Sequence, residues 1–379
     1  MHTTKTPATG TQIELSGPDI TEAEIHAVAA VLRSGRLSLG PAVPRFEQSV
    51  ARFVGVKHAV AVSSGTCGLH LLMRAIGISP NDEVIGTPFS FVASSNCVLY
   101  EGGKPVFVDI DPDTWNIDPT RVEAAVNART RAIIPVNVFG QPADMDAIAA
   151  IARRHRLRVI EDSCESLGAR YKGRMSGSLG DAGVFGFYPN KQITTGEGGM
   201  ITTNDDEIAR LCISMRNQGR DTGMGWLSHE RLGFNYRLSD VACAIGAVQM
   251  ERIEEILSKR RRVAGWYMDR LTGDARIGFQ KIVPECEMSW FVFVIRLADE
   301  YSDEDRARTI EQLRARGIGC SNYFAPIHLQ NFYRRDFGYK PGDFPNCERV
   351  AARTIALPFH NHLSESDVDR VCETLRSLL

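Results

Sequence analysis

The feature that most constrains the fold of this chain is an alternation of two hydrophobic periodicities between about Glu14 and Met250. Stretches with apolar residues every three or four positions alternate with short β-branched runs that end in turn residues. This pattern predicts βαβ units and a mainly parallel sheet. The predicted helices are 22–34, 44–54, 65–76, 119–126, 145–155 and 205–218, and the predicted strands are 59–62, 83–86, 106–109, 132–136, 158–161, 182–187 and 199–202.

The C-terminal third of the chain has a different pattern. A long amphipathic stretch, 239–269, leads out of the alternating region and is followed by fewer strands. Because 379 residues exceed what one hydrophobic core usually serves, we expect an α/β protein with two domains. These are a large domain over 14–254 and a smaller α+β domain over 255–379, preceded by a flexible tail over 1–13. The elements predicted after 269 are strands 281–283 and 290–296 and helices 303–316 and 365–378.

Composition excludes several classes of protein. The formal net charge is −2, and the short basic cluster 259–262 follows a helical pattern and is expected to form a solvated helix face. The nine cysteines are scattered without a C-x-x-C pair, so we expect neither a zinc site nor a disulfide framework. No apolar stretch reaches the roughly 18 residues that span a bilayer. We therefore expect a reduced, cytoplasmic protein without a metal, a nucleic-acid partner or a membrane partner.

Three short motifs lie at the ends of predicted strands, where sites form in parallel sheets. Ser63 to Thr66 stands between a strand and a helix and can present free N–H groups to an anion, or can be an ordinary N-cap. Asp162 ends one apolar run, and Lys191 follows another. Each motif alone is weak evidence, since a lysine in such a place is commonly a surface residue. Together they supply the anion site, the carboxylate and the amine that a pyridoxal cofactor requires.

The order of these and further motifs resembles the DegT/DnrJ/EryC1/StrS family of sugar aminotransferases. The resemblance extends from about Glu14 to Leu379, and it implies a fold-type-I transferase dependent on pyridoxal 5′-phosphate (PLP). The motifs that carry it are 63–66, Thr87-Pro88-Phe89, 140–145, Glu161-Asp162, Gly180-Asp181, 187–191, 196–200 and 233–237.

The resemblance implies a role for individual residues. Lys191 would hold PLP as the internal aldimine, and Asp162 would face the pyridine nitrogen. The other implied cofactor contacts are Ser64, Gly65 and Thr66 at the phosphate, Phe91 stacked on the ring, and Asn235 presented by the neighbouring subunit of a homodimer. Tyr188, Tyr323 and His328 would lie at the substrate, although His328 could equally be structural.

Two positions depart from the family pattern. Gly186 stands where the family often has a serine that binds the phosphate, and we expect another group, such as Ser178, to replace that hydroxyl. Glu165 stands where the family often has a glutamine close to the ring oxygen of the cofactor. A carboxylate there would repel the phenolate, so either Glu165 turns away or the protons are distributed differently.

The resemblance also implies a reaction. L-Glutamate would convert PLP to pyridoxamine phosphate, and the amine would pass to a nucleotide-linked ketosugar, with C4 of a 4-keto-6-deoxyhexose as the expected position. A ketocyclitol acceptor remains an alternative. So does a dehydratase, although that branch of the family has histidine in place of Lys191.

Overall fold

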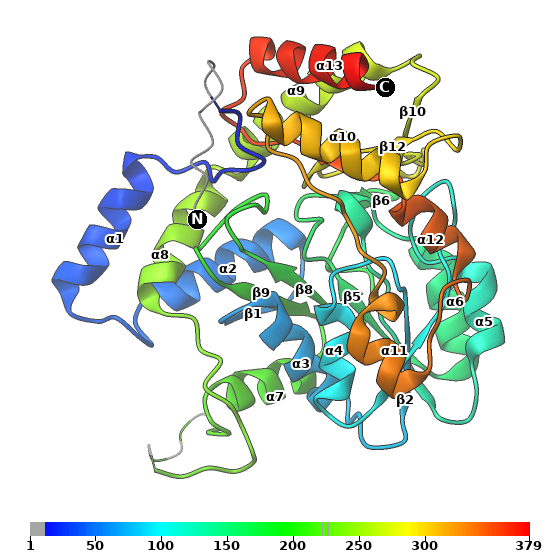
Figure 1. Cartoon of the computed structure of the whole chain (residues 1–379). Coiled ribbons are helices and arrows are strands. Elements are labelled where there is room, and N and C mark those ends of the chain that lie inside the picture. The colour runs from blue at the N-terminus through cyan, green and yellow to red at the C-terminus, as the bar shows by residue number, and fades with distance from the viewer. Residues whose placement is uncertain (1–11, 222, 224, 226) are drawn as a thin grey trace, which may run out of the picture.

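The computed structural model describes residues 12–221, 223, 225 and 227–379, and its centre is a seven-stranded sheet (Figure 1). The strand order is β1-β9-β8-β5-β4-β2-β3. All neighbours pair in parallel except those of β9, which runs against both β1 and β8. The strands are β1 (His58–Val62), β2 (Glu83–Gly86), β3 (Lys104–Phe107), β4 (Thr130–Ile133), β5 (Arg158–Asp162), β8 (Ala182–Gly186) and β9 (Gly199–Thr203).

Helices cover both faces of this sheet because successive strand side chains point in opposite directions. Val184 of β8 packs into a core with α3, α4 and α7, whereas the next residue, Phe185, packs into a core with α2, α8 and α9. The helices are α1 (Glu22–Ser34), α2 (Ala42–Val54), α3 (Gly65–Ala75), α4 (Ala93–Leu99), α5 (Pro119–Ala125), α6 (Met145–His155), α7 (Asp206–Arg216), α8 (Asp240–Glu251) and α9 (Ile253–Leu271).

A second, antiparallel sheet, β10-β12-β13, has its own core with α9, α10 and α13. In Figure 1 this layer lies above the central sheet, beside the yellow-to-red C-terminal segments. Ile256 of α9 belongs to the large core and Tyr267 to the small one, so this helix joins the two. The remaining elements are β6 (Arg170–Tyr171), β7 (Arg174–Met175), β10 (Ile277–Phe279), β11 (Cys286–Glu287), β12 (Phe293–Leu297), β13 (Thr354–Leu357), α10 (Asp303–Ala315), α11 (Asn331–Phe337), α12 (Pro345–Ala351) and α13 (Glu365–Leu378).

The structure confirms the predicted parallel sheet and corrects several details. The stretch 239–269 is two helices that meet at Arg252, and the predicted strand 281–283 is wrong. The N–H of Lys281 donates to Asp113 and that of Val283 donates to the Gln141 side chain, so this segment is a loop. The boundary at 254/255 falls inside α9 and stays a prediction. Helices α4, α11 and α12 and strands β6, β7, β10, β11 and β13 were not predicted.

The expected tail lies outside the described residues as far as residue 11, but its last residue is not loose. Ile13 is buried in the core of the second sheet and bridges Ile318. Further along, Asp19 accepts hydrogen bonds from Arg252, Lys259 and Asn361. These contacts connect the segment before α1 to the junction of α8 and α9 and to the loop 358–364 between β13 and α13.

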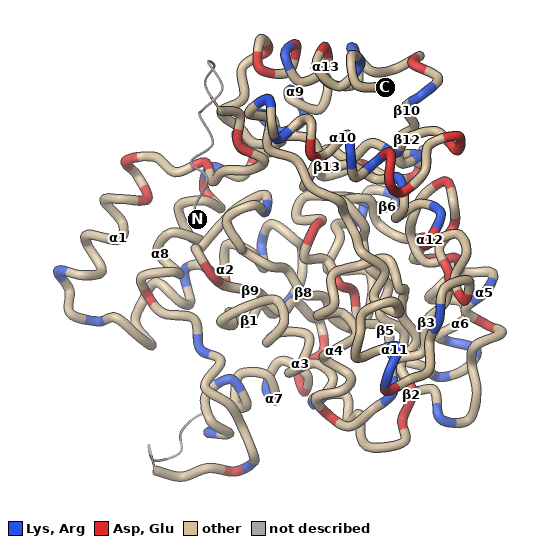
Figure 2. Tube along the Cα trace, viewed as in Figure 1, with Lys and Arg blue, Asp and Glu red and all other residues tan. Residues whose placement is uncertain are grey.

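No helix in the described ranges is long and apolar enough to cross a membrane. Lysine and arginine are interspersed with aspartate and glutamate along the trace in Figure 2. Among the described residues, no group of three or more histidine, cysteine, aspartate or glutamate side chains could hold a metal ion.

Candidate active site

Lys191 follows β8, and its side chain lies in a largely buried position against an acid and an aromatic ring. Its Nζ is 3.7 Å from Oε1 of Glu165 and 3.8 Å from the centre of the Phe291 ring. The side chains of Lys191 and Glu165 are 16% and 6% exposed. Carboxylate and ring face both stabilise an ammonium where water is scarce. The lysine is therefore an interior group and not a surface residue.

The two carboxylates that end β5 point to opposite faces of the sheet. Glu161 accepts hydrogen bonds from the N–H groups of Gly177, Leu179 and Gly180 at 2.5–2.9 Å, so it shapes a loop. Asp162 is buried at the strand end, and its Oδ1 accepts from the N–H of residue 164 at 3.1 Å. Burial raises the pKa of Asp162 above its ordinary value, while that hydrogen bond and the charge of Lys191 act in the opposite direction. Of these two carboxylates, Asp162 is the one on which the charge of Lys191 acts.

The first turn of α3 lies beside Cys164, two residues after Asp162. Ser64 caps the helix by accepting from the N–H of Cys67 at 3.1 Å, which leaves the first N–H groups of the helix free to meet an anion. A Cβ on Gly65 would stand 2.7 Å from Sγ of Cys164, and one on Gly186 would stand 3.4 Å from the same atom. The first turn of α3, Ser64 to Thr66, thus forms a narrow cradle with Gly186, and the Cys164 thiol lies against both glycines.

Comparisons with known proteins show which family has this arrangement of residues. The family model described as "DegT/DnrJ/EryC1/StrS aminotransferase family" matches residues 18–376. The chain belongs to this family. It is 42% identical to GDP-perosamine synthase of Caulobacter vibrioides over 90% of this chain and 91% of that protein. It is 38% identical to the spore coat polysaccharide biosynthesis protein SpsC of Bacillus subtilis over 96% of both chains.

Solved structures agree with the sequence comparisons. The PMP form of a sugar aminotransferase from Streptococcus pneumoniae, Spr1654, superposes with a TM-score of 0.92 at 28% identity, covering 97% of this chain and 98% of that one. S. venezuelae DesV in complex with a ketimine intermediate superposes with a TM-score of 0.89 at 34% identity, with the same coverage. The fold is the fold-type-I PLP-dependent transferase fold, the protein is a PLP-dependent aminotransferase, and both sequence expectations are confirmed.

The residues of this family member fit PLP. The cradle at Ser64, Gly65 and Thr66 suits the phosphate, the buried carboxylate of Asp162 suits a protonated pyridine nitrogen, and Lys191 supplies the amine. These individual assignments stay predictions.

Aromatic residues line the approach to Lys191. The Tyr323 ring stacks with Phe291, with a centroid distance of 6.4 Å and an interplanar angle of 9°. Burial raises the pKa of the Tyr323 hydroxyl, and so does the negative charge of Glu165. Phe91 and Tyr188 are 63% and 54% exposed, so both rings are open to solvent in the single chain. The structure therefore brings Tyr323 to the Phe291 ring beside Lys191, while no described hydrogen bond or ring contact joins the side chain of Tyr188 or Phe91 to them.

Ser178 lies on the wrong face of the sheet for a phosphate contact. Its hydroxyl donates to the carbonyl of Met175 at 2.6 Å. The preceding residue, Gly177, lies against the ring of Phe185, which faces α2 and α8, whereas α3 covers the opposite face. This geometry does not support the expectation that Ser178 replaces the hydroxyl missing at Gly186.

His328 is 0% exposed and is held inside the protein. Its Nε2 lies 3.0 Å from Oε1 of Glu348, and its ring packs edge-on against Phe344 and Tyr339. Burial lowers the pKa of His328. Of the two alternatives for this residue, the geometry supports a structural role and not a substrate contact.

Asn235 is an exposed residue between two anchored aromatic side chains. Phe234 and Tyr236 stack on one another, and the Tyr236 hydroxyl lies 3.1 Å from Nδ1 of the buried His70. No described contact brings Asn235 to Lys191 of its own chain. This placement leaves Asn235 free to meet a second subunit.

Sequence reasoning missed Arg260, which was expected on a solvated helix face. The side chain is 3% exposed, and its guanidinium donates to the carbonyl oxygens of Lys191 at 2.7 Å and Phe291 at 3.1 Å. Burial lowers the pKa of Arg260 to about 10, so it stays charged at neutral pH. Its position was readable from the sequence, because Ile256, Arg260 and Val263 share one helix face.

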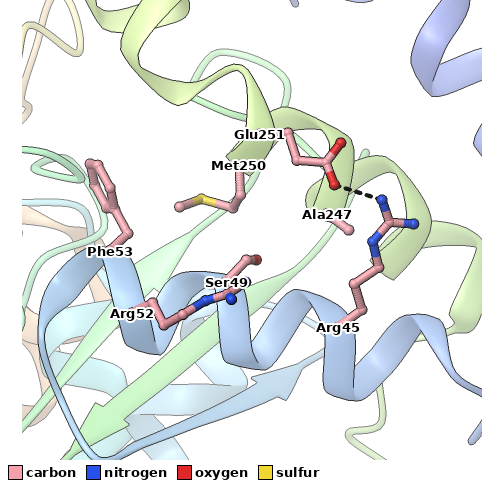
Figure 3. Close-up of a pocket in the computed structure, with 7 residues that line it drawn as sticks. All are labelled: Arg45, Ser49, Arg52, Phe53, Ala247, Met250 and Glu251. Carbon is pink, nitrogen blue, oxygen red and sulfur yellow. Dashed lines mark hydrogen bonds and ion pairs between the residues drawn. The ribbon is translucent and has the colours of Figure 1, made fainter.

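A surface cavity of about 370 Å³ lies between α2 and α8, away from these residues (Figure 3). Arg45, Arg52 and Glu251 are among its lining residues, and Arg45 pairs with Glu251 at 2.6 Å. It contains none of the predicted site residues, so its presence does not alter the assignment.

We predict that Arg260→Lys weakens PLP binding by at least about ten-fold and lowers the melting temperature, since an ammonium cannot span both carbonyls and each buried acceptor left unpaired costs about 1–3 kcal/mol. Titration of the apoprotein with PLP, followed by absorbance, measures the affinity. Arg261→Lys makes the same change at the neighbouring exposed position and serves as the control. Equal behaviour of the two variants would contradict a positioning role for Arg260.

Proposed function

We propose that this enzyme transfers an amino group from L-glutamate to a nucleotide-linked ketosugar in aminosugar biosynthesis, at C4 of a 4-keto-6-deoxyhexose. The observation that carries the proposal is the largely buried amine of Lys191 between Glu165 and Phe291, whose charge also acts on Asp162. An amine there can bind an aldehyde and carry protons, which a histidine could not do in the same way. The similarity to GDP-perosamine synthase supports a nucleotide-sugar substrate.

The chain's own residues would divide the work as follows. The N–H groups of Gly65 and Thr66 and the hydroxyls of Ser64 and Thr66 bind the phosphate, and Asp162 holds a proton on the pyridine nitrogen. When bound, PLP supplies an electron sink for the carbon that loses its proton. Nζ of Lys191 takes the proton from Cα of the donor and later returns a proton to the sugar carbon. Tyr188 and Tyr323 flank the substrate and exclude water.

We further propose a cytoplasmic homodimer with shared active sites. All nine cysteines are free thiols, as in a reducing compartment. The exposed position of Asn235, between the partly buried rings of Phe234 and Tyr236, supports its presentation to the phosphate of the partner's site.

L-Glutamate alone is predicted to convert the bound cofactor to its amine form and to release one equivalent of 2-oxoglutarate. Adding a 4-keto-6-deoxy nucleotide sugar should then restore the original spectrum and give an aminosugar, detected by mass spectrometry. Loss of water from the sugar without gain of nitrogen would instead identify a dehydratase. Amination of a ketoinositol but of no nucleotide sugar would identify a cyclitol aminotransferase.

Mixing Lys191→Ala with Asn235→Asp is predicted to restore activity if the active sites are shared. A heterodimer then holds one site with both lesions and one intact site, whereas neither parent has an intact site. Each variant incubated alone is the control, and native mass spectrometry confirms subunit exchange. Confirmed exchange without recovery of activity would show that each subunit is self-contained.

A further inference from the structure

Glu165 and Lys191 form an ion pair that has little access to water. It is the one ion pair that Lys191 makes in the described part of the chain. Oε2 of Glu165 is anchored, because it accepts the N–H of Phe139 at 2.9 Å, which leaves Oε1 directed at Nζ. Glu165 therefore does not turn away from the site, which removes one of the two alternatives raised by its sequence position.

A buried ion pair of this kind can exchange a proton internally. Low dielectric surroundings disfavour separated charges, so the neutral pair of amine and carboxylic acid gains relative to the ionic pair. Burial raises the pKa of the Glu165 carboxyl, as does the charge of Asp162, whereas Lys191 and the Phe139 N–H oppose this shift. The other titratable groups at the pair are Cys164, whose pKa is raised well above normal by burial, and the hydroxyl of Tyr323.

We propose that Glu165 is the general base that takes the proton of Lys191 when the lysine attacks the aldehyde of PLP. An N–H bond of the ammonium breaks, its proton moves to Oε1, and the lone pair stays on Nζ. That lone pair forms the bond to the aldehyde carbon, and the carbonyl oxygen leaves as water with the two remaining amine protons. A base of suitable strength within reach is what such a nucleophile needs.

The step leaves Glu165 as a neutral carboxylic acid beside the cofactor. A neutral acid does not repel the ring oxygen and can donate a hydrogen bond to it. Glu165 is therefore suited to the site before and after PLP binds. Before binding it is a carboxylate that pairs with the Lys191 ammonium, and after Lys191 has bonded to PLP it is a neutral acid. The proposal concerns cofactor capture alone, so it can fail or hold whatever the amino acceptor proves to be.

The test is the rate at which apoprotein captures PLP, followed by absorbance across a range of pH. Glu165→Gln keeps the size of the side chain and an acceptor for Phe139, but it cannot take a proton. We expect capture at pH 7 to slow by about ten-fold or more. The difference from wild type should shrink as the pH rises, because hydroxide and water then deprotonate the lysine.

Two further variants make the result specific. Glu165→Asp retains a proton acceptor and should recover part of the rate. Glu83→Gln removes another buried carboxylate, which pairs with Arg129 at the start of β2, the strand end opposite the site, and should leave the rate unchanged. In wild type, infrared difference spectra on PLP binding should show a new protonated carboxyl band that Glu165→Gln lacks. Equal capture rates for wild type and Glu165→Gln at every pH, or the same band in both, would overturn the proposal.

Discussion

An ammonium group held away from water must find compensating charge, and this constraint organises the whole site around Lys191. Glu165 supplies the opposite charge, the ring of Phe291 supplies a negative face, and Arg260 holds the backbone of both Lys191 and Phe291 by their carbonyl oxygens. Since Arg260 lies on α9, which spans both cores, the position of the lysine depends on the packing of the small sheet against the large one.

Successive side chains of β5 point to opposite faces of the sheet, so the last two residues of the strand have different roles. Glu161 and Asp162 are neighbours, yet one organises the loop 177–180 on the α8 face and the other lies by the cradle of α3 on the opposite face. Ser178 belongs to that loop, and its hydroxyl donates to the carbonyl of Met175. The side chain that lies next to Gly186 in the cradle is the thiol of Cys164.

Local patterns were enough to predict the parallel sheet and the carboxyl-end location of Asp162 and Lys191, because alternating periodicities determine both. They could not place groups whose position depends on contacts distant in sequence. The segment 281–283 reads as a strand, but its N–H groups bond to residues 113 and 141. His328 has the sequence context of a substrate residue, but packing against Phe344 and Glu348 buries it. Arg260 was missed because all four residues of the basic cluster 259–262 were assigned to a solvated helix face. Of these four, only Arg260 lies on the apolar face of the helix.

The assignment of Lys191 as the residue that binds PLP is the claim on which the mechanism depends, and reductive trapping tests it most directly. Holoenzyme is treated with borohydride, digested, and mapped by mass spectrometry. We expect one phosphopyridoxyl group per chain, on the peptide that contains Lys191, and none in a Lys191→Ala variant. Stoichiometric labelling of any other lysine would contradict the account.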